Sequence, residues 1–227
     1  MTEATTLEST RAGAAEKQPN GAEMAIAALE ANGAEVIFGI PGVHTLALYD
    51  ALRGSSIRHV LARHEQGVGF MADGYARASG KPGVALVITG PGVTNVATAV
   101  GQAYTDSSPV FVLSSNVNRA HLDKMRGNLH DLKDQMGVMA AVTQWNARVL
   151  DPNDAFSTVS EGMGRLKSGR PLPVHVEIPI DVLDEPATLV DRAGEQHAKR
   201  RPEPDAIRDA ARRLAAAGRV AIYCGGG

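Results

Sequence analysis

The residue best suited to chemistry in this chain is Glu65, which lies in the sequence RHEQG at residues 63–67. It directly follows an apolar segment at residues 59–62, which we predict to be a strand followed by a helix. A carboxylate in this place lies at the carboxyl edge of a parallel sheet, where open α/β sheets bind ligands. Buried against a ligand, Glu65 can exchange a proton with it. The alternative interpretation is that Glu65 only occupies the first turn of a helix, where the helix dipole stabilises a carboxylate.

Other predicted strand ends carry glycine-rich or polar turns. They are GIPG at residues 39–42, TGPG at residues 89–92 with Thr94 and Asn95 close behind, and SSN at residues 114–116. Glycine lets the backbone approach a flat ligand closely, and proline fixes the turn. One such loop by itself indicates only a tight strand-to-helix turn. Several of them at one edge, around a carboxylate, indicate a ligand site.

Several common catalytic and binding motifs are absent from the sequence. There is no G-x-G-x-x-G after the first strand, no Walker-type phosphate loop, no zinc spacing and no G-x-S-x-G elbow. Scattered histidines (His44, His64, His121 and His130) are interpreted as surface or hydrogen-bonded side chains rather than ligands. The sequence therefore predicts no metal ligands.

Apolar strands alternate with helical patterns along most of the chain. Strands are predicted at residues 36–38, 59–62, 84–88, 109–113, 147–150 and 174–178. Helices are predicted near residues 21–32, 45–52, 65–79, 93–104 and 136–142, and from residue 153 or 154 onward. Continuous apolar strands that alternate with helices predict a mostly parallel sheet covered on both faces. Residues 21–183 are thus predicted to form one doubly wound α/β domain of about six strands.

The flanking segments have a different composition. Residues 1–20 lack apolar periodicity and predict a disordered tail. Residues 184–203 are charged and contain proline, which favours a linker. Residues 204–227 give one helix, a strand at residues 220–223 and a triple glycine, as at the entrance of a nucleotide-binding unit. We expect this segment to be the truncated start of a second α/β domain.

Composition excludes several classes of partner. The net charge is −2 and aromatic residues make up 4% of the chain, so nucleic acid is not an expected partner. No apolar run approaches the roughly 20 residues of a membrane span, so no membrane is expected. The single cysteine, Cys224, excludes an internal disulfide, and the first residues do not resemble a secretory signal. We therefore expect a cytoplasmic protein.

Five motifs together carry a family resemblance. They follow in order as FGIPG (38–42), RHEQG (63–67), DGYAR (73–77), GPGVTN (90–95) and PVHVEIP (173–179). The chain resembles the pyrimidine-binding N-terminal domain of thiamine-diphosphate enzymes of the acetolactate synthase and 2-oxoacid decarboxylase group. The resemblance covers residues 21–183, and five ordered motifs are far more specific than one.

The resemblance implies roles for named residues. Glu65 is implied to hydrogen-bond the pyrimidine N1′ of thiamine diphosphate and to share a proton with it, which activates the thiazolium C2 position for attack on a 2-oxoacid. An apolar pocket raises the pKa of a carboxyl group, which suits this sharing. Further implied cofactor contacts are Pro41, Gly42, Gly90, Pro91, Gly92 and Asn95. A homodimer or homotetramer is implied as well, because the cofactor lies between two chains in the family.

The chain departs from acetolactate synthases at positions that face the substrate in relatives. Asn116 stands in place of the glutamine of a Gly-Gln pair, and His130-Asp131-Leu132 replaces a Phe-Gln-Glu segment. This pattern is more similar to oxoacid decarboxylases, including those that act on guanidino-oxoacids. Asn116 and His130 are therefore predicted substrate-side residues, and His130 could serve as an acid–base group. An exposed loop histidine is the alternative interpretation.

The family's Gly-Asp-Gly motif, which holds magnesium and the diphosphate, is absent from this chain. We therefore expect the magnesium ligands to lie outside this chain, which should be inactive alone, and FAD remains a candidate cofactor of a missing central domain. Two alternatives stay open. The chain could be a non-catalytic regulatory or assembly module with the same fold, or one subunit of a split enzyme.

Overall fold

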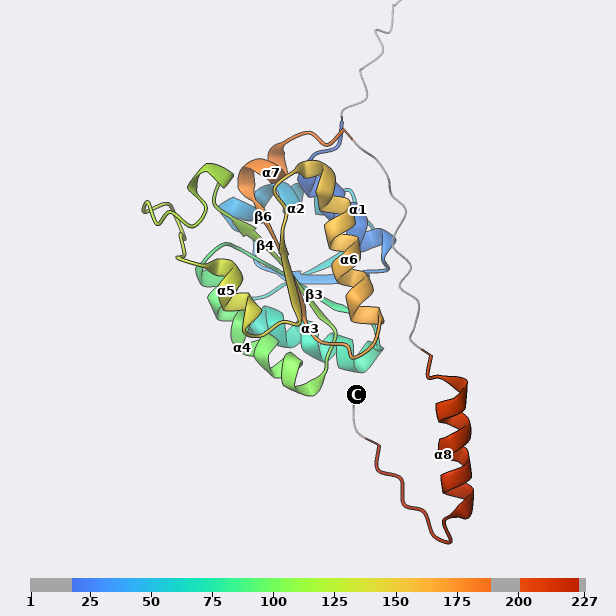
Figure 1. The fold of residues 1–227 in the computed structure, drawn as a ribbon. Helices are drawn as coiled ribbons and strands as arrows, with labels where there is room; N and C mark the ends of the chain where they lie inside the picture. The colour runs from blue at the N-terminus through green and yellow to red at the C-terminus, as the bar shows by residue number, and fades with distance from the viewer. Residues whose placement is uncertain (1–17, 189–200, 225–227) are drawn as a thin grey trace, which may run out of the picture.

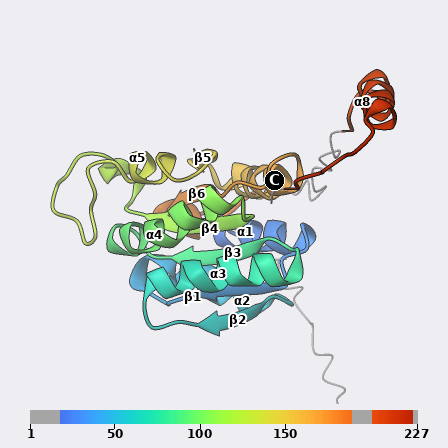
Figure 2. The same ribbon diagram turned by 90° about the horizontal axis from the view of Figure 1, so that it is seen from below.

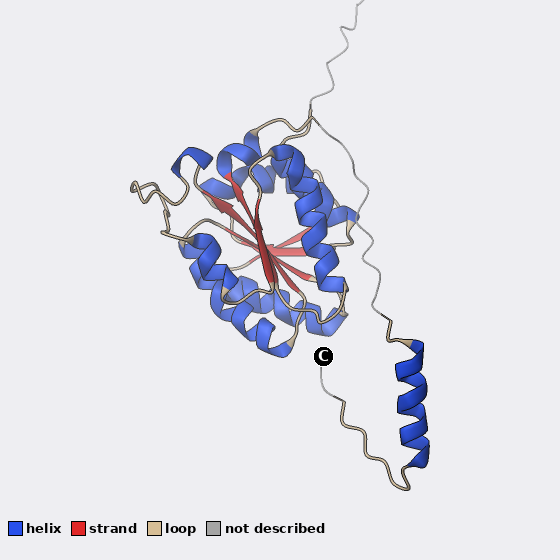
Figure 3. Ribbon diagram, in the orientation of Figure 1, coloured by secondary structure: helices blue, strands red, loops and turns tan. Residues whose placement is uncertain are grey.

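The structure of the protein, a computed structural model, describes residues 18–188 and 201–224. Most of the predicted disordered tail (residues 1–17 of 1–20), most of the predicted linker (residues 189–200 of 184–203) and the triple glycine at residues 225–227 lie outside the described residues. Figure 3 shows a central group of strands surrounded by helices. Among the described residues, no helix combines the length and the apolar character needed to cross a membrane.

All six predicted strands are present and form one parallel sheet in the order β2-β1-β3-β4-β6-β5 (Figure 2). The strands are β1 (Val36–Gly39), β2 (Arg58–Leu61), β3 (Gly83–Val87), β4 (Val110–Asn116), β5 (Trp145–Arg148) and β6 (Val174–Pro179). The sequential order of the strands reverses between β1 and β3, as in other doubly wound sheets, while all strands run parallel. The predicted fold class, a six-stranded α/β domain, is confirmed.

Helices cover both faces of this sheet (Figure 1). They are α1 (Gly21–Ala31), α2 (Leu46–Leu52), α3 (Glu65–Ser79), α4 (Pro91–Asp106), α5 (Gln135–Ala140), α6 (Ala155–Lys167) and α7 (Ile180–Asp184). Short 3-10 turns lie at Val43–Thr45, Arg119–His121 and Pro152–Asp154. Helices α1, α2, α6 and α7 pack on one face, and α3, α4 and α5 pack on the other.

The alternation of side chains along each strand divides the core into two halves. In β4, Phe111 and Leu113 face the α1 and α6 side, whereas Val110 and Val112 face the α3 and α4 side. The same alternation in β6 places the side chains of Val174, Val176 and Ile178 on the α1 side. The side chains of His175 and Glu177 therefore lie on the opposite face, where the short helix α5 covers the sheet. Two buried polar residues thus lie under α5.

The folded domain extends slightly beyond its predicted bounds. Asn20, predicted to be in the tail, caps α1 and forms a β-bridge with Pro186, predicted to be in the linker. The N–H of Ala187 donates to the carbonyl of Pro19 at 2.7 Å, and Ala187 is buried. These contacts join the two ends of the domain. Composition could not reveal them, because both segments are polar and the contacts connect residues far apart in sequence.

Helix α8 (Pro204–Ala216) is present as predicted, but residues 220–223 do not form a strand. A strand needs a neighbouring strand to hydrogen-bond with, and the described residues provide none there. The apolar side chains Ile207 and Leu214 of α8 are about half exposed. The assignment of residues 204–227 to a second domain therefore stays a prediction.

Candidate functional site

The loops singled out in the sequence meet at one edge of the sheet. Because the strands are parallel, the carboxyl ends of β2, β1, β3 and β4 lie side by side in that order. Residues 40–42 follow β1, Glu65 follows β2, residues 89–92 follow β3, and Asn116 ends β4. This edge spans the point where the strand order reverses, the usual ligand position in such folds.

Glu65 is the first residue of α3 and is half-buried. His64 caps the helix, and its side chain accepts a hydrogen bond from the Gln66 N–H. The Nδ2 atom of Asn95, on α4, donates to Glu65 Oε2 at 2.9 Å. Within residues 18–188 and 201–224, no side chain donates to Oε1 of Glu65. One carboxylate oxygen is thus fixed by Asn95, and the other is available to a ligand.

The position of Glu65 also agrees with the alternative interpretation, since helix dipoles favour a carboxylate in the first turn. The contact with Asn95 is a second constraint on the carboxylate, and the role of Glu65 stays a prediction. A glutamate that only begins a helix needs no amide donor from a second helix. Both members of this pair, Glu65 and Asn95, were predicted cofactor contacts, and the structure brings them together.

Glycines hold the neighbouring loops in close contact around Ile88. A Cβ atom on Gly42 would lie 2.5 Å from Ile88 Cδ1, and one on Gly92 would lie 2.8 Å from Ile88 Cγ2. Gly90 has φ = 64°, which favours glycine, and a Cβ atom there would lie 2.1 Å from the carbonyl oxygen of His130. Pro41 and Pro91 are exposed beside these glycines. The glycines therefore let the predicted cofactor loops pack closely into one surface at this edge of the sheet.

Two histidines meet beside this surface. The rings of His44 and His130 lie 5.9 Å apart in an edge-to-face arrangement, and His44 Nδ1 lies 3.0 Å from Thr89 Oγ1. Burial and the nearby His130 both lower the pKa of His44. His44 was not among the predicted site residues. Its position two residues after Gly42, in a loop already assigned to the site, was the signal that could have identified it.

Asn116 is buried, and both ends of its side chain have partners within the protein. Its Nδ2 atom donates to Glu177 Oε1 at 3.1 Å, and its Oδ1 atom accepts from the Val117 N–H at 2.8 Å. The predicted contact between Asn116 and substrate stays a prediction. In this structure the side chain belongs to a buried polar network.

Glu177 is the centre of that network and is fully buried. Its carboxylate accepts hydrogen bonds from Arg148 Nε, from Asn116 Nδ2 and from Gln135 Nε2. Arg148 in turn pairs with Asp123 at 2.7 Å. Glu177, Arg148 and Gln135 were not among the predicted site residues. A glutamate within the apolar run of β6 was the available signal, since charged side chains are buried only when they are paired.

His175, next to Glu177 in β6, gives the domain a pH-dependent stability. Its Nε2 atom lies 2.8 Å from Ser114 Oγ, and its Nδ1 atom is buried without a partner. Burial, followed by the positive charge of Arg148, lowers the pKa of His175 from 6.5 to about 3. The unfolded chain therefore binds more protons than the folded chain between these values, and stability is lost as the pH falls through this window.

We expect the free energy of unfolding to fall by roughly 1 kcal/mol per pH unit below pH 6.5 because of His175. Denaturant unfolding of the parent and of His175→Gln at pH 7, 6 and 5 measures this slope. The variant is expected to show a flatter dependence on pH, whatever its stability at pH 7. Equal slopes in the two proteins would contradict the assignment.

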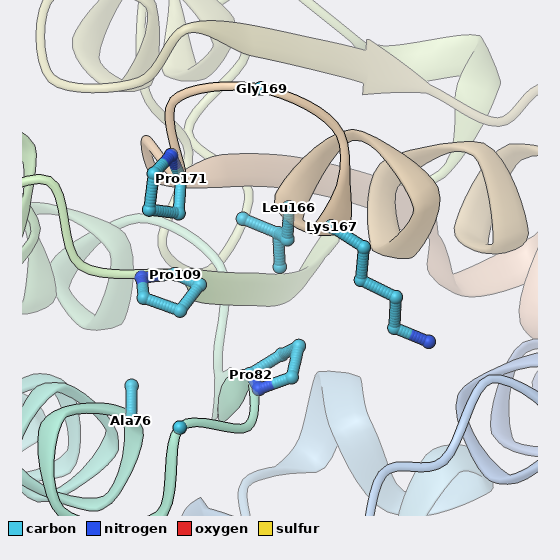
Figure 4. A pocket seen from close by; sticks show the side chains of 8 residues that line it. Ala76, Pro82, Pro109, Leu166, Lys167, Gly169 and Pro171 are labelled. Carbon is cyan, nitrogen blue, oxygen red and sulfur yellow. The ribbon is translucent and has the colours of Figure 1, made fainter. Parts of the chain in front are cut away.

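A separate cavity of about 550 Å³ lies at the opposite edge of the sheet (Figure 4). It is lined by Ala76, Gly80, Pro82, Pro109, Leu166, Lys167, Gly169 and Pro171. Lys167 is the single charged residue of this lining, and its ammonium group donates to the Asn32 carbonyl. No carboxylate, hydroxyl or thiol side chain is among these lining residues. Glu65 and its neighbours therefore remain the best candidate site.

Across the described ranges, no group of three or more His, Cys, Asp and Glu side chains is arranged to hold a metal ion.

Comparison with known proteins identifies similar sequences. A protein named "Probable 2-ketoarginine decarboxylase AruI" from Pseudomonas aeruginosa is 52% identical over 209 residues, which cover 91% of this chain and 37% of the relative. A "Probable acetolactate synthase large subunit" from Methanocaldococcus jannaschii is 39% identical over 216 residues, covering 91% and 36%. The "Acetolactate synthase isozyme 1 large subunit" of Escherichia coli is 37% identical over 216 residues, covering 93% and 38%.

The chain thus spans little more than a third of the length of these relatives. The family model described as "Thiamine pyrophosphate enzyme, N-terminal TPP binding domain" matches residues 19–138. That range contains Glu65, Asn95 and the glycine-rich loops at the carboxyl edge of the sheet, and it begins where the folded domain begins. The chain belongs to the thiamine pyrophosphate enzyme family, as its N-terminal cofactor-binding domain.

Proposed function

We propose that the complete protein containing this chain is a thiamine-diphosphate-dependent enzyme that acts on a 2-oxoacid, with Glu65 as the residue that activates the cofactor. One observation carries the proposal. In a domain of this family, Glu65 lies at the carboxyl edge of the sheet with Oε2 held by Asn95 and Oε1 available to a ligand. A flat ring with a weakly basic nitrogen is a ligand that this arrangement suits.

The residues around Glu65 fit the pyrimidine part of the cofactor. Glu65 would hold a proton against the ring nitrogen, while Asn95 keeps the carboxylate in one orientation. Gly42 and Gly92 let their loops pack against Ile88, Gly90 lets its turn pack against the His130 carbonyl, and Pro41 and Pro91 restrict the same turns. When bound, thiamine diphosphate supplies the carbon centre that takes up the electrons left by decarboxylation.

The substrate we propose is a 2-oxoacid with a guanidino side chain, and the reaction is decarboxylation. The relative named as a 2-ketoarginine decarboxylase is 52% identical, against 39% and 37% for the two acetolactate synthases compared with it. His130 and Asn116 are proposed to lie on the substrate side. The edge-to-face contact of His130 with His44 supports this, because it places two imidazoles beside the cofactor loops. Carboligation, as in acetolactate synthases, is the second candidate.

Other parts of the proposal rest on the resemblance. Magnesium bound outside this chain, assembly as a homodimer or homotetramer, and a cytoplasmic location stay predictions. FAD is a further candidate cofactor of the complete protein.

The function is tested with the complete protein, supplied with thiamine diphosphate and magnesium. Carbon dioxide release is measured with 2-ketoarginine and with pyruvate, and acetolactate is measured in the pyruvate reaction. We expect release from 2-ketoarginine at the higher kcat/KM. Acetolactate as the main product would support the carboligase instead. Failure to bind the cofactor, with no turnover of either substrate, would support the non-catalytic module.

A further inference from the structure

Gln135 lies at the junction between the buried network and the cofactor loops. It is the first residue of α5, and its side chain is almost fully buried. Its Nε2 atom donates to Glu177 Oε2 and to the Ser115 carbonyl, both at 2.9 Å. Its Oε1 atom accepts from the Gly90 N–H at 2.8 Å. One amide group thus connects two strands to the turn at residues 90–92.

The hydrogen-bond partners of Gln135 determine which way its amide points. A carboxylate and a carbonyl can only accept, so the NH₂ group must face Glu177 and Ser115. The oxygen then faces Gly90, which offers an N–H donor. No other assignment of the two amide atoms satisfies all three partners. A leucine at this position would leave the Gly90 N–H and the Glu177 oxygen without their partner.

The anchor of this arrangement is a buried carboxylate with several partners. Glu177 lies on β6, between β4 and the edge strand β5, and is held by Arg148 from β5 and by Asn116 from β4. Gly90, in contrast, is the residue before α4, provides no side-chain cap and has a positive φ of 64°. The hydrogen bond from its N–H to Gln135 therefore ties a conformationally special turn to a fixed charged group.

The same turn touches the segment that leads into α5. The α-carbon of Gly90 faces the carbonyl of His130 so closely that a Cβ atom would lie 2.1 Å from it. His130 itself has φ = 63°. Gln135 thus holds Gly90 and, five residues after His130, also fixes the end of the segment that carries this histidine.

We propose that Gln135 is a positioning residue: through the Gly90 N–H it sets the turn at residues 90–92 that forms one wall of the pyrimidine site, with Glu177 as its anchor. The inference rests on the proposed function for the identity of the ligand. The link between Gln135 and the turn does not depend on that function and is measured without cofactor.

The first test compares Gln135→Leu with Thr143→Val in the complete protein. Thr143 is a matched control, because it is also buried and makes one side-chain hydrogen bond, to the Met139 carbonyl, away from Gly90. Amide hydrogen exchange in the cofactor-free protein reports on residues 88–95. We expect exchange there to be roughly tenfold faster in Gln135→Leu, for the loss of about one hydrogen bond, and unchanged in Thr143→Val.

Cofactor binding supplies the second readout. Gln135→Leu is expected to raise the Kd for thiamine diphosphate by about tenfold, whereas Thr143→Val is expected to leave it unchanged. Unchanged exchange in Gln135→Leu, or equal changes in both variants, would overturn the inference. If amide exchange is faster in Gln135→Leu but the parent protein does not bind thiamine diphosphate, the proposed function is contradicted. The link between Gln135 and the turn at residues 90–92 would then still stand.

A conservative variant provides a rescue experiment. In Gln135→Glu, a protonated carboxyl group can donate to Glu177 and accept from Gly90, as the amide does, whereas two ionised carboxylates would repel each other. Glu177 is the ionisable side chain that contacts position 135 directly. Arg148 contacts Glu177, and His175 contacts Ser114 on β4. We expect slow exchange at residues 88–95 and tight cofactor binding to return between pH 8 and pH 6 in Gln135→Glu alone. Absence of this return would also overturn the inference.

Discussion

Replacement of Glu65 by glutamine is expected to abolish most of the activity of the complete enzyme. Glutamine keeps the shape of the side chain and can still accept the hydrogen bond from Asn95 Nδ2, so the fold and the site geometry should persist. It cannot hold and return a proton. Loss of one positioned acid–base group typically costs about 10²- to 10⁴-fold in rate. We therefore expect exchange of the thiazolium C2 proton, measured by NMR, to slow by that factor.

The matched control for this prediction is Glu161→Gln. Glu161 is a half-exposed glutamate on α6, on the other face of the sheet, and pairs with Arg165 four residues later. Its replacement should leave C2 proton exchange unchanged. Exchange at the parent rate in Glu65→Gln would show that Glu65 only begins α3 and takes no part in proton transfer.

The sequence predicted well which loops meet at the carboxyl edge of the sheet, because each of these loops is a local feature. Each loop follows an apolar strand directly, and parallel strands bring their carboxyl ends to one edge. Glu65 and Asn95 were both identified in this way, although they are thirty residues apart. What the sequence could not provide was the hydrogen bond between them. That bond depends on how α3 and α4 pack, which follows from the strand order β1-β3-β4.

The buried network was not predicted, and the reason is its dependence on distant residues. Glu177 takes its partners from Asn116, Gln135 and Arg148, which lie 29 to 61 residues away and on different elements. In the sequence, each of these appears as an isolated polar residue. Only the pairing of β4 with β6, and of β6 with β5, brings them together.

The boundaries of strands also depend on contacts between residues far apart in the sequence. The edge strand β5 was predicted at residues 147–150 and lies at Trp145–Arg148. The apolar side chain of Leu150 moved the prediction toward the C-terminus, yet this side chain is half exposed. The pairing of Trp145 with Val174 sets the real register. Apolar character alone does not set register at an edge strand, because one side of the strand has no neighbour.

Replacement of Arg148 by methionine is expected to destabilise the domain more than any other single change at a charged residue in the site. The variant would leave the Glu177 carboxylate buried without its cation, with only two amide donors. Removing one partner of a buried ion pair typically costs about 3–5 kcal/mol. Urea unfolding at pH 7 measures the loss. Arg53→Met is the matched control, since Arg53 pairs with Asp50 on the surface and both side chains are about four-fifths exposed. It should have no measurable effect.

A double variant distinguishes an unpaired charge from simple loss of packing. In Arg148→Met with Glu177→Leu, the buried charge is removed together with its partner, so the desolvation cost disappears. We expect the double variant to be more stable than Arg148→Met alone, although it also frees the amide of Gln135 and should loosen the turn at Gly90. Additive losses in the two single variants would mean that Arg148 stabilises β5 through its alkyl chain. Stability recovered without recovery of cofactor binding would separate the two tasks of Glu177, holding Arg148 and anchoring Gln135.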